Sequence, residues 1–177
     1  MLKRALFAIV GLAGSMLHAQ VAPAGKGFRA EYLAELSVAE DHIVRLATVI
    51  PAERYTWRPA PGVRSISEVL LHIASSQFNL PAVLGVDAGA SMKQAAFERS
   101  TANKDTIVAA LKAAFAATRS ALAKLSDADA ERTLAWFDGT NTYRGVLYFM
   151  ARHTGEHTGQ LIAYARTIGV VPPWSER

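Results

Sequence analysis

Four long segments of this 177-residue chain carry apolar side chains at intervals of three and four residues, and none shows the alternation of a sustained β-strand. They cover about residues 27–50, 65–85, 104–125 and 143–168. An amphipathic helix must bury its apolar face against another element, and here the other elements are also helices. We therefore predict an all-α fold, a four-helix bundle.

Residues with known capping preferences mark where these helices begin and end. Ser65-Ile66-Ser67-Glu68 fits a capping box, in which the serine side chain accepts from the Glu68 amide and the glutamate reaches back. The other boundary residues are Pro51, which ends the first helix, Asn103 and Thr142 or Asn141, which cap the third and fourth, and Gly169, which closes the fourth.

Two connections interrupt the helical pattern. The long one, residues 86–102, would let the third helix start at the end of the bundle away from where the second stopped. The second, residues 126–141, contains one expected helical turn at residues 127–131.

The first residues are typical of a secretory signal peptide. Lys3 and Arg4 precede an uncharged run that ends in Leu17-His18-Ala19. We expect residues 1–19 to be the signal, 20–25 a short linker and 26–177 the bundle domain, in a periplasmic or secreted protein. The run is shorter than the roughly 20 residues that span a bilayer, so no stable membrane span is expected.

Composition limits the kinds of partner and site. Without the signal the chain has 17 Lys and Arg against 15 Asp and Glu, a net charge of +2, and no basic block that would favour nucleic acid. The chain has no cysteine, so a metal site must use His, Asp or Glu. The alanine-rich faces are compatible with a homodimer, and the expected ligand is a small molecule.

Two histidines replace hydrophobes in the apolar seam of the last helix. His153 and His157 are four residues apart, which places their Cβ atoms roughly 5–6 Å from each other on one face. His72, in the apolar part of the second helix, is a third candidate if the two helices face each other. Three neutral imidazoles suit Zn, Ni, Fe or Cu and leave coordination positions open. The alternative is a set of core histidines hydrogen-bonded to neighbours.

The segment His153-Thr154-Gly155-Glu156-His157 also fits H-x-x-E-H, a pattern of some zinc peptidases. Glu156 would be the general base, but it lies about 80° to one side of the line between the histidines. Such peptidases take a third ligand from a carboxylate well downstream, and only Glu176 follows, beyond Pro172 and Pro173. The peptidase is therefore kept only as a minor alternative.

Two motifs resemble those of the DinB-like proteins, also called the bacillithiol-transferase-like fold. His153-x-x-x-His157-Thr158-Gly159-Gln160, followed by Tyr164-Ala165-Arg166, Gly169 and Pro172, resembles the family's C-terminal signature. Trp57-Arg58-Pro59, followed by a helix that carries His72, resembles its second motif. Their order and separation extend the resemblance over roughly residues 26–175.

The resemblance implies a four-helix bundle that holds a divalent metal through His72, His153 and His157. The expected ion is Zn or Ni, with Fe or Mn as alternatives. Gln160 matches a glutamine that would bind a metal-bound water or hold a ring in place, and a polar residue at a helix interface is its other interpretation. Arg64 departs from the family, which often has an aromatic residue there.

Characterised relatives include thiol transferases and a thiol-dependent isomerase. The resemblance therefore implies a metal-dependent enzyme acting on a small molecule, a hydrolase or a thiol S-transferase, with Gln160 and Glu156 as catalytic candidates. Export argues against the thiol cofactor, because small thiols are concentrated in the cytosol. A non-catalytic bundle that binds a metal or ligand is the alternative.

Overall fold

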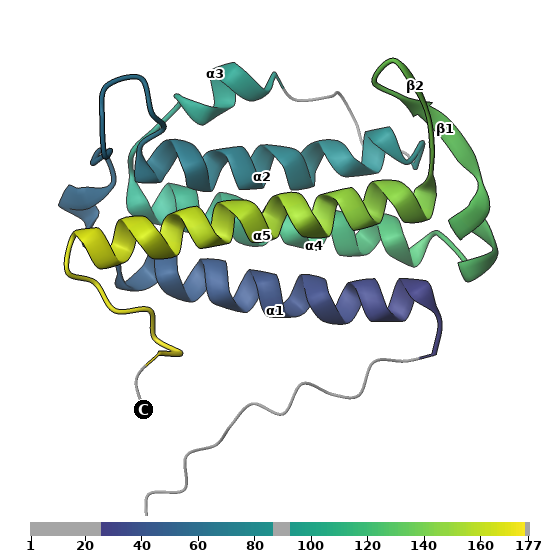
Figure 1. The fold of residues 1–177 in the computed structure, drawn as a ribbon, viewed down its shortest axis with the longest axis horizontal. Helices are drawn as coiled ribbons and strands as arrows, with labels where there is room; N and C mark the ends of the chain where they lie inside the picture. The colour runs from purple at the N-terminus through teal and green to yellow at the C-terminus, as the bar shows by residue number, and fades with distance from the viewer. Residues whose placement is uncertain (1–25, 87–92, 176–177) are drawn as a thin grey trace, which may run out of the picture.

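Four long helices form a bundle in the computed structural model, which describes residues 26–86 and 93–175. They are α1 (Phe28–Val49), α2 (Ile66–Val83), α4 (Lys104–Ala123) and α5 (Tyr143–Thr167) (Figure 1). Helices α1 and α2 each pack against both α4 and α5. The predicted bundle is confirmed for this part of the chain, while the predicted signal peptide and linker lie outside the described residues.

The chain crosses the length of the bundle between α2 and α4. Figure 1 shows it returning over α2, so that α2 and α4 run in the same direction. This return contains a short helix that the sequence did not indicate, α3 (Gln94–Glu98), which packs on α2. The predicted crossover is confirmed. Its helix was missed because five residues are too few to show helical periodicity.

The predicted helix boundaries hold to within about two residues. Ser65 and Glu68 form the capping box in both directions at the start of α2. The Asn103 side chain accepts from the Thr106 amide, and Thr142 caps α5. Gly169 follows α5 with φ of +81°, a conformation that favours glycine.

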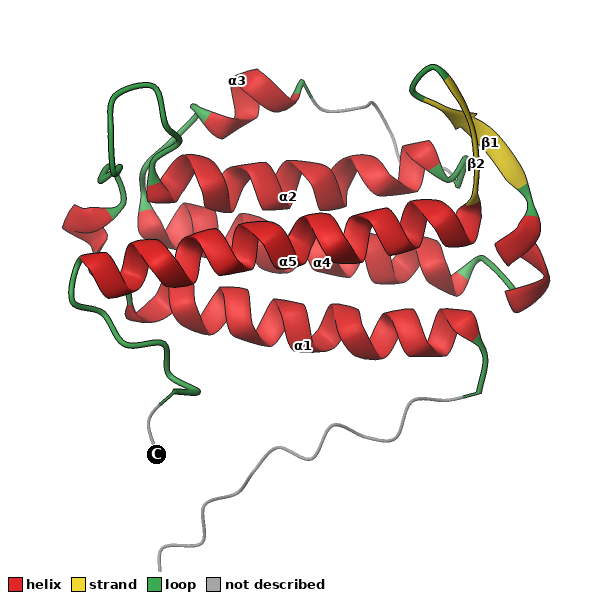
Figure 2. Ribbon diagram, in the orientation of Figure 1, coloured by secondary structure: helices red, strands yellow, loops and turns green. Residues whose placement is uncertain are grey.

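The connection before α5 corrects the all-α prediction. It contains the expected turn, η2 (Asp127–Glu131), and then an antiparallel hairpin of β1 (Thr133–Trp136) and β2 (Gly139–Thr142), yellow in Figure 2. Each strand has four residues, and only β1 alternates exposed and partly buried side chains. Such short strands give too little alternation to be detected in the sequence.

A buried polar network joins three of the helices inside the apolar core. Thr118 Oγ1 donates to Gln77 Oε1 over 2.8 Å, and Gln77 Nε2 donates to Thr154 Oγ1 over 3.1 Å. All three residues are buried, and each hydrogen bond offsets the cost of removing a polar group from water. The network therefore fixes α2, α4 and α5 relative to one another.

Helix α4 is long and apolar enough to cross a membrane, with a mean hydropathy of 1.3 over its best window. Core helices of globular bundles pass the same test of length and composition. In this fold α4 packs between α1 and α2, and it carries the buried side chains Ile107, Leu111 and Phe115.

The capping box at Ser65 is expected to contribute measurably to stability. Ser65→Ala removes the acceptor of the Glu68 amide and should lower the free energy of unfolding by about 1 kcal/mol. Urea denaturation followed by circular dichroism measures this change. Ser37→Ala is the control, since the exposed Ser37 hydroxyl only bonds the Leu33 carbonyl within α1. An equal effect of both substitutions would contradict the assignment.

Candidate metal centre

Three histidines from two helices meet in the bundle. His72 comes from α2, and His153 and His157 come from successive turns of α5. One nitrogen of each lies within 4.8 Å of the others, and Nε2 of His72 lies 2.9 Å from Nε2 of His153. His72 is buried, and the other two rings are partly buried. The structure thus brings together all three residues that the sequence selected as metal ligands.

A carboxylate from α3 fixes the ring of His72. Oε1 of Glu98 lies 2.7 Å from Nδ1 of His72, and Arg64 Nε donates to Oε2 of the same carboxylate over 2.8 Å. Glu98 is only 8% exposed. A proton on Nδ1 directed at Glu98 leaves Nε2 unprotonated and turned toward the other two histidines.

Gln160 plays the corresponding part for His157. Its Oε1 atom lies 2.9 Å from His157 Nδ1, and its Nε2 atom donates to the Tyr164 hydroxyl over 2.8 Å. Trp57 packs edge-on against Tyr164, with ring centroids 5.4 Å apart. Of the two interpretations of Gln160, this geometry favours the one in which it orients a ring.

The third ring, His153, is held by packing instead. It stacks on Phe149 at 5.8 Å with an angle of 11° between the rings. Its Nδ1 atom is buried, with no hydrogen-bond partner among the described residues. Burial, followed by the neighbouring His157 and His72, lowers the pKa of His153 to about 4. The ring is therefore neutral near pH 7, as a metal ligand must be.

Burial and charge act in opposite directions on the pair of His72 and Glu98. Burial lowers the pKa of His72, although its hydrogen bond to Glu98 opposes this. Burial by itself would raise the pKa of Glu98, but the hydrogen bonds from Arg64 and His72 outweigh it and the pKa lies below its usual value. Near pH 7 the pair is a neutral imidazole beside a carboxylate that is also paired with Arg64.

These observations fit a divalent metal ion. The facing Nε2 atoms of His72 and His153 can hold one proton between them, whereas a divalent ion accepts both lone pairs at once. His157 supplies a third nitrogen, with its Nδ1 atom already bound to Gln160. Three imidazole nitrogens on fixed rings can hold such an ion and leave positions open on it.

Two other polar residues, Glu156 and His42, lie apart from this cluster. Glu156 is exposed and forms an ion pair with Arg152, so the position expected of a peptidase base is not occupied by its carboxylate. His42 is a partly buried residue of α1 that stacks on Trp174 at 4.2 Å.

Two hollows open beside the histidines. One, about 270 Å³, is lined by His72 and His153 and by the aromatic side chains Trp136, Phe137 and Phe149. The other, a more open hollow of about 650 Å³, is lined by Glu98 and Gln160 together with Arg58, Arg64 and Arg99. Small molecules can therefore reach His72 and His153 from the apolar hollow, whereas the polar hollow is bounded by Glu98 and Gln160, the hydrogen-bond partners of His72 and His157.

Sequence reasoning missed the residues that the two connections contribute. Glu98 and Gln94, whose amide nitrogen lies 2.6 Å from His72 Nδ1, come from α3, and Trp136 and Phe137 come from the hairpin. No spacing relates these residues to the histidines, because they reach the site only through the fold. Arg64, noted as a departure from the family, is the partner of Glu98.

Comparisons of the sequence and of the fold with known proteins both point to DinB-like proteins. A family model described as DinB superfamily matches residues 35–161. A crystal structure of a DinB-like protein from Bacillus cereus superposes with a TM-score of 0.71 at 19% identity, covering 80% of this chain and 93% of that one. A DinB-like protein from Bacillus subtilis gives 0.65 at 22% identity, covering 83% and 99%. A search of curated proteins finds no match.

A third solved structure carries a name that states an activity. The mycothiol-dependent maleylpyruvate isomerase superposes with a TM-score of 0.60 at 16% identity, covering 77% of this chain and 63% of that one. At such identities these similarities establish the shared fold. They leave the chemistry to be argued from the residues of this chain.

Removal of the Glu98 carboxylate should weaken metal binding. We expect Glu98→Gln to lower the affinity for Zn or Ni about tenfold and Glu98→Ala up to about 100-fold, because the ring of His72 loses its anionic acceptor. Competition with a chelator of known affinity measures both. Glu156→Gln, an exposed substitution on α5, is the control and should leave affinity unchanged. Equal affinities for all three variants would contradict the role of Glu98.

The lowered pKa of His153 predicts a pH dependence of stability. Between its pKa of about 4 in the fold and about 6.5 in the unfolded chain, only the unfolded chain binds the proton. The free energy of unfolding therefore falls as the pH is lowered through this window. In chelator-treated protein, His153→Gln should lose less stability between pH 7 and pH 5 than the unsubstituted chain, measured by urea denaturation. Equal losses would contradict the shift.

Proposed function

Since the chain belongs to the DinB superfamily, we propose that it is a metal-dependent enzyme acting on a small molecule through His72, His153 and His157. The observation that carries the proposal is the convergence of three imidazole nitrogens within 4.8 Å in the bundle. Two of the rings are fixed by hydrogen bonds to Glu98 and Gln160. A cluster that served only to fill the core would have no need of oriented, neutral rings.

The chemistry follows from what such a centre supplies. A bound divalent ion would lower the pKa of a water or thiol at an open position and so provide a nucleophile near neutral pH. Neighbouring side chains of this chain keep the three histidine rings oriented for metal binding. Glu98 and Gln160 keep the ligating nitrogens aimed inward, and the stacked Phe149 keeps His153 in place.

The aromatic hollow is the proposed place of the substrate's apolar part. Trp136 and Phe149 pack edge-to-face at 5.2 Å, and Phe137, 82% exposed with φ of +46°, extends the wall from the hairpin turn. His72 and His153 line the same hollow. A substrate lying there has its reactive group next to the cluster and excludes water from one side of it.

Water and a substrate thiol are the two nucleophiles that this proposal considers. The name of the structurally similar isomerase includes dependence on mycothiol, which supports the thiol reaction. The proposed export of the chain, from its signal-like first residues, supports hydrolysis, because water requires no cytosolic cofactor. We propose hydrolysis as the first reaction to test and thiol transfer as the second.

Elemental analysis and activity measurements test the proposal together. The full chain should contain about one Zn or Ni per molecule, and His153→Ala or His157→Ala should lose it. The loaded protein should hydrolyse aryl esters or amides, or transfer a low-molecular-weight thiol to an aryl halide, and both variants should fall to the background rate. Metal content is measured by emission spectrometry, and turnover by chromophore release.

Two controls separate the alternatives. His42→Ala should retain metal and activity, since His42 lies outside the cluster. Glu156→Gln should also retain activity, whereas the H-x-x-E-H peptidase requires that it abolish hydrolysis while metal stays bound. Tight metal retention with no turnover in either assay would favour a binding protein, and metal-free protein would overturn the proposal altogether.

A further inference from the structure

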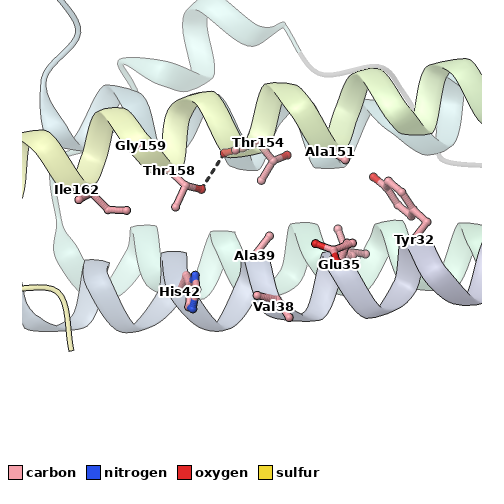
Figure 3. A pocket seen from close by; sticks show the side chains of 12 residues that line it. Tyr32, Glu35, Val38, Ala39, His42, Ala151, Thr154, Thr158, Gly159 and Ile162 are labelled. Carbon is pink, nitrogen blue, oxygen red and sulfur yellow. Dashed lines mark hydrogen bonds between the residues drawn. The ribbon is translucent and has the colours of Figure 1, made fainter. Parts of the chain in front are cut away.

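A third cavity lies between α1 and α5, and none of the three histidines of the metal centre lines it. It measures about 310 Å³ (Figure 3). Helix α1 contributes Tyr32, Glu35 and His42, and α5 contributes Gly155, Gly159 and Ile162. An apolar cavity of about 150 Å³ is large enough for benzene, so this one has room for a ring with a short chain attached.

Two glycines keep the α5 wall of this cavity open. Gly155 and Gly159 lie in the interior of a 25-residue helix, where glycine costs roughly 0.5–1 kcal/mol relative to alanine. Packing does not require them, because a Cβ atom at either position would meet nothing within 4 Å. The effect of the two glycines is to leave space beside α5 that a side chain would fill.

The hydroxyl group of a buried tyrosine faces this space. Tyr32 is 6% exposed overall, and its hydroxyl, with no hydrogen-bond partner among the described residues, is still reached by solvent. Figure 3 shows its ring rising from α1 into the gap between the helices. Burial raises the pKa of Tyr32, so the hydroxyl stays protonated and can both donate and accept a hydrogen bond. Water can bond this hydroxyl in the free protein, and a ligand in the cavity can take the place of that water.

The charge of the cavity wall selects the kind of ligand. Glu35 lies one turn after Tyr32 on the same face of α1, is exposed, and has no ion pair among the described residues. No lysine or arginine lines the cavity. The Glu35 carboxylate therefore gives this wall a negative charge, which attracts a cation and repels an anion.

We propose that this cavity is a second small-molecule site, which takes an apolar amine. The apolar part lies along Gly155, Gly159 and Ile162. The ammonium group lies at the mouth beside the Glu35 carboxylate and donates a second hydrogen bond to the Tyr32 hydroxyl. This site is separate from the metal centre and does not depend on the function proposed for it.

Three probes that differ in charge test the proposal on the full chain without metal. They are 2-phenylethylamine, 2-phenylethanol and 3-phenylpropionate, with binding followed by calorimetry. The amine should bind about tenfold or more tightly than the carboxylate, since one is attracted by Glu35 and the other repelled. Glu35→Gln should remove this preference while the alcohol binds as before.

Filling the cavity is the second test. Gly155→Leu and Gly159→Leu place a side chain in open space and improve helix propensity, so both variants should fold and bind none of the probes. Ala163→Leu places the same side chain at an exposed position of α5 that does not line the cavity and should leave binding unchanged. His153→Ala should also leave it unchanged, which separates this site from the metal centre.

Three results would overturn the proposal. The first is absence of binding by all three probes, and the second is equal binding of amine and carboxylate. The third is a dimer, seen by light scattering, that Gly155→Leu dissociates, because the cavity would then be the contact with a second copy of the chain.

Discussion

The packing of α2 against α5 buries three polar imidazole rings, wholly or in part, and the rest of the site compensates for their burial. It brings His72 opposite His153 and His157, three polar rings where a bundle would otherwise have hydrophobes. A buried polar atom without a partner costs about 1–3 kcal/mol, so each ring nitrogen needs a hydrogen-bond partner or an ion. Glu98 and Gln160 supply acceptors for His72 and His157, whereas Phe149 only packs on His153, whose Nδ1 atom has no hydrogen-bond partner among the described residues. The same contacts that make the rings tolerable in the core also aim their nitrogens at one point.

The connections between the long helices supply residues of the site that the four-helix bundle itself does not. The crossover carries Glu98 onto α2, and the hairpin sets Trp136 and Phe137 against the rings of α5. A rigid bundle with variable connections is a common way to keep a ligand set while the substrate pocket changes. Arg64, in the connection between α1 and α2, pairs with Glu98 and so links the edge of the polar hollow to the carboxylate that holds His72.

Helix α5 lies between the metal centre and the cavity against α1. His153 and His157 face the metal centre, whereas Gly155 and Gly159 face α1. Positions two apart on a helix lie about 200° around its axis, and so one helix can line two different cavities. The proposed amine site and the metal centre thus share a wall without sharing a residue that both need.

The sequence by itself determined the long helices, their caps and the pairing of His153 with His157 on one helix face, because each depends on local spacing or on a capping group within a few residues. Capping at Ser65 and the seam of His153 and His157 are of this kind, and the structure bears them out. That His72 meets this pair was decided by the packing of α2 against α5. The hairpin, α3 and the partners Glu98 and Tyr164 were decided by the tertiary structure. Their segments are too short for periodicity, or their contacts join residues far apart in the chain. Glu35 and Gly155 line one cavity only because α1 and α5 pack side by side, and nothing in their local sequence indicates this.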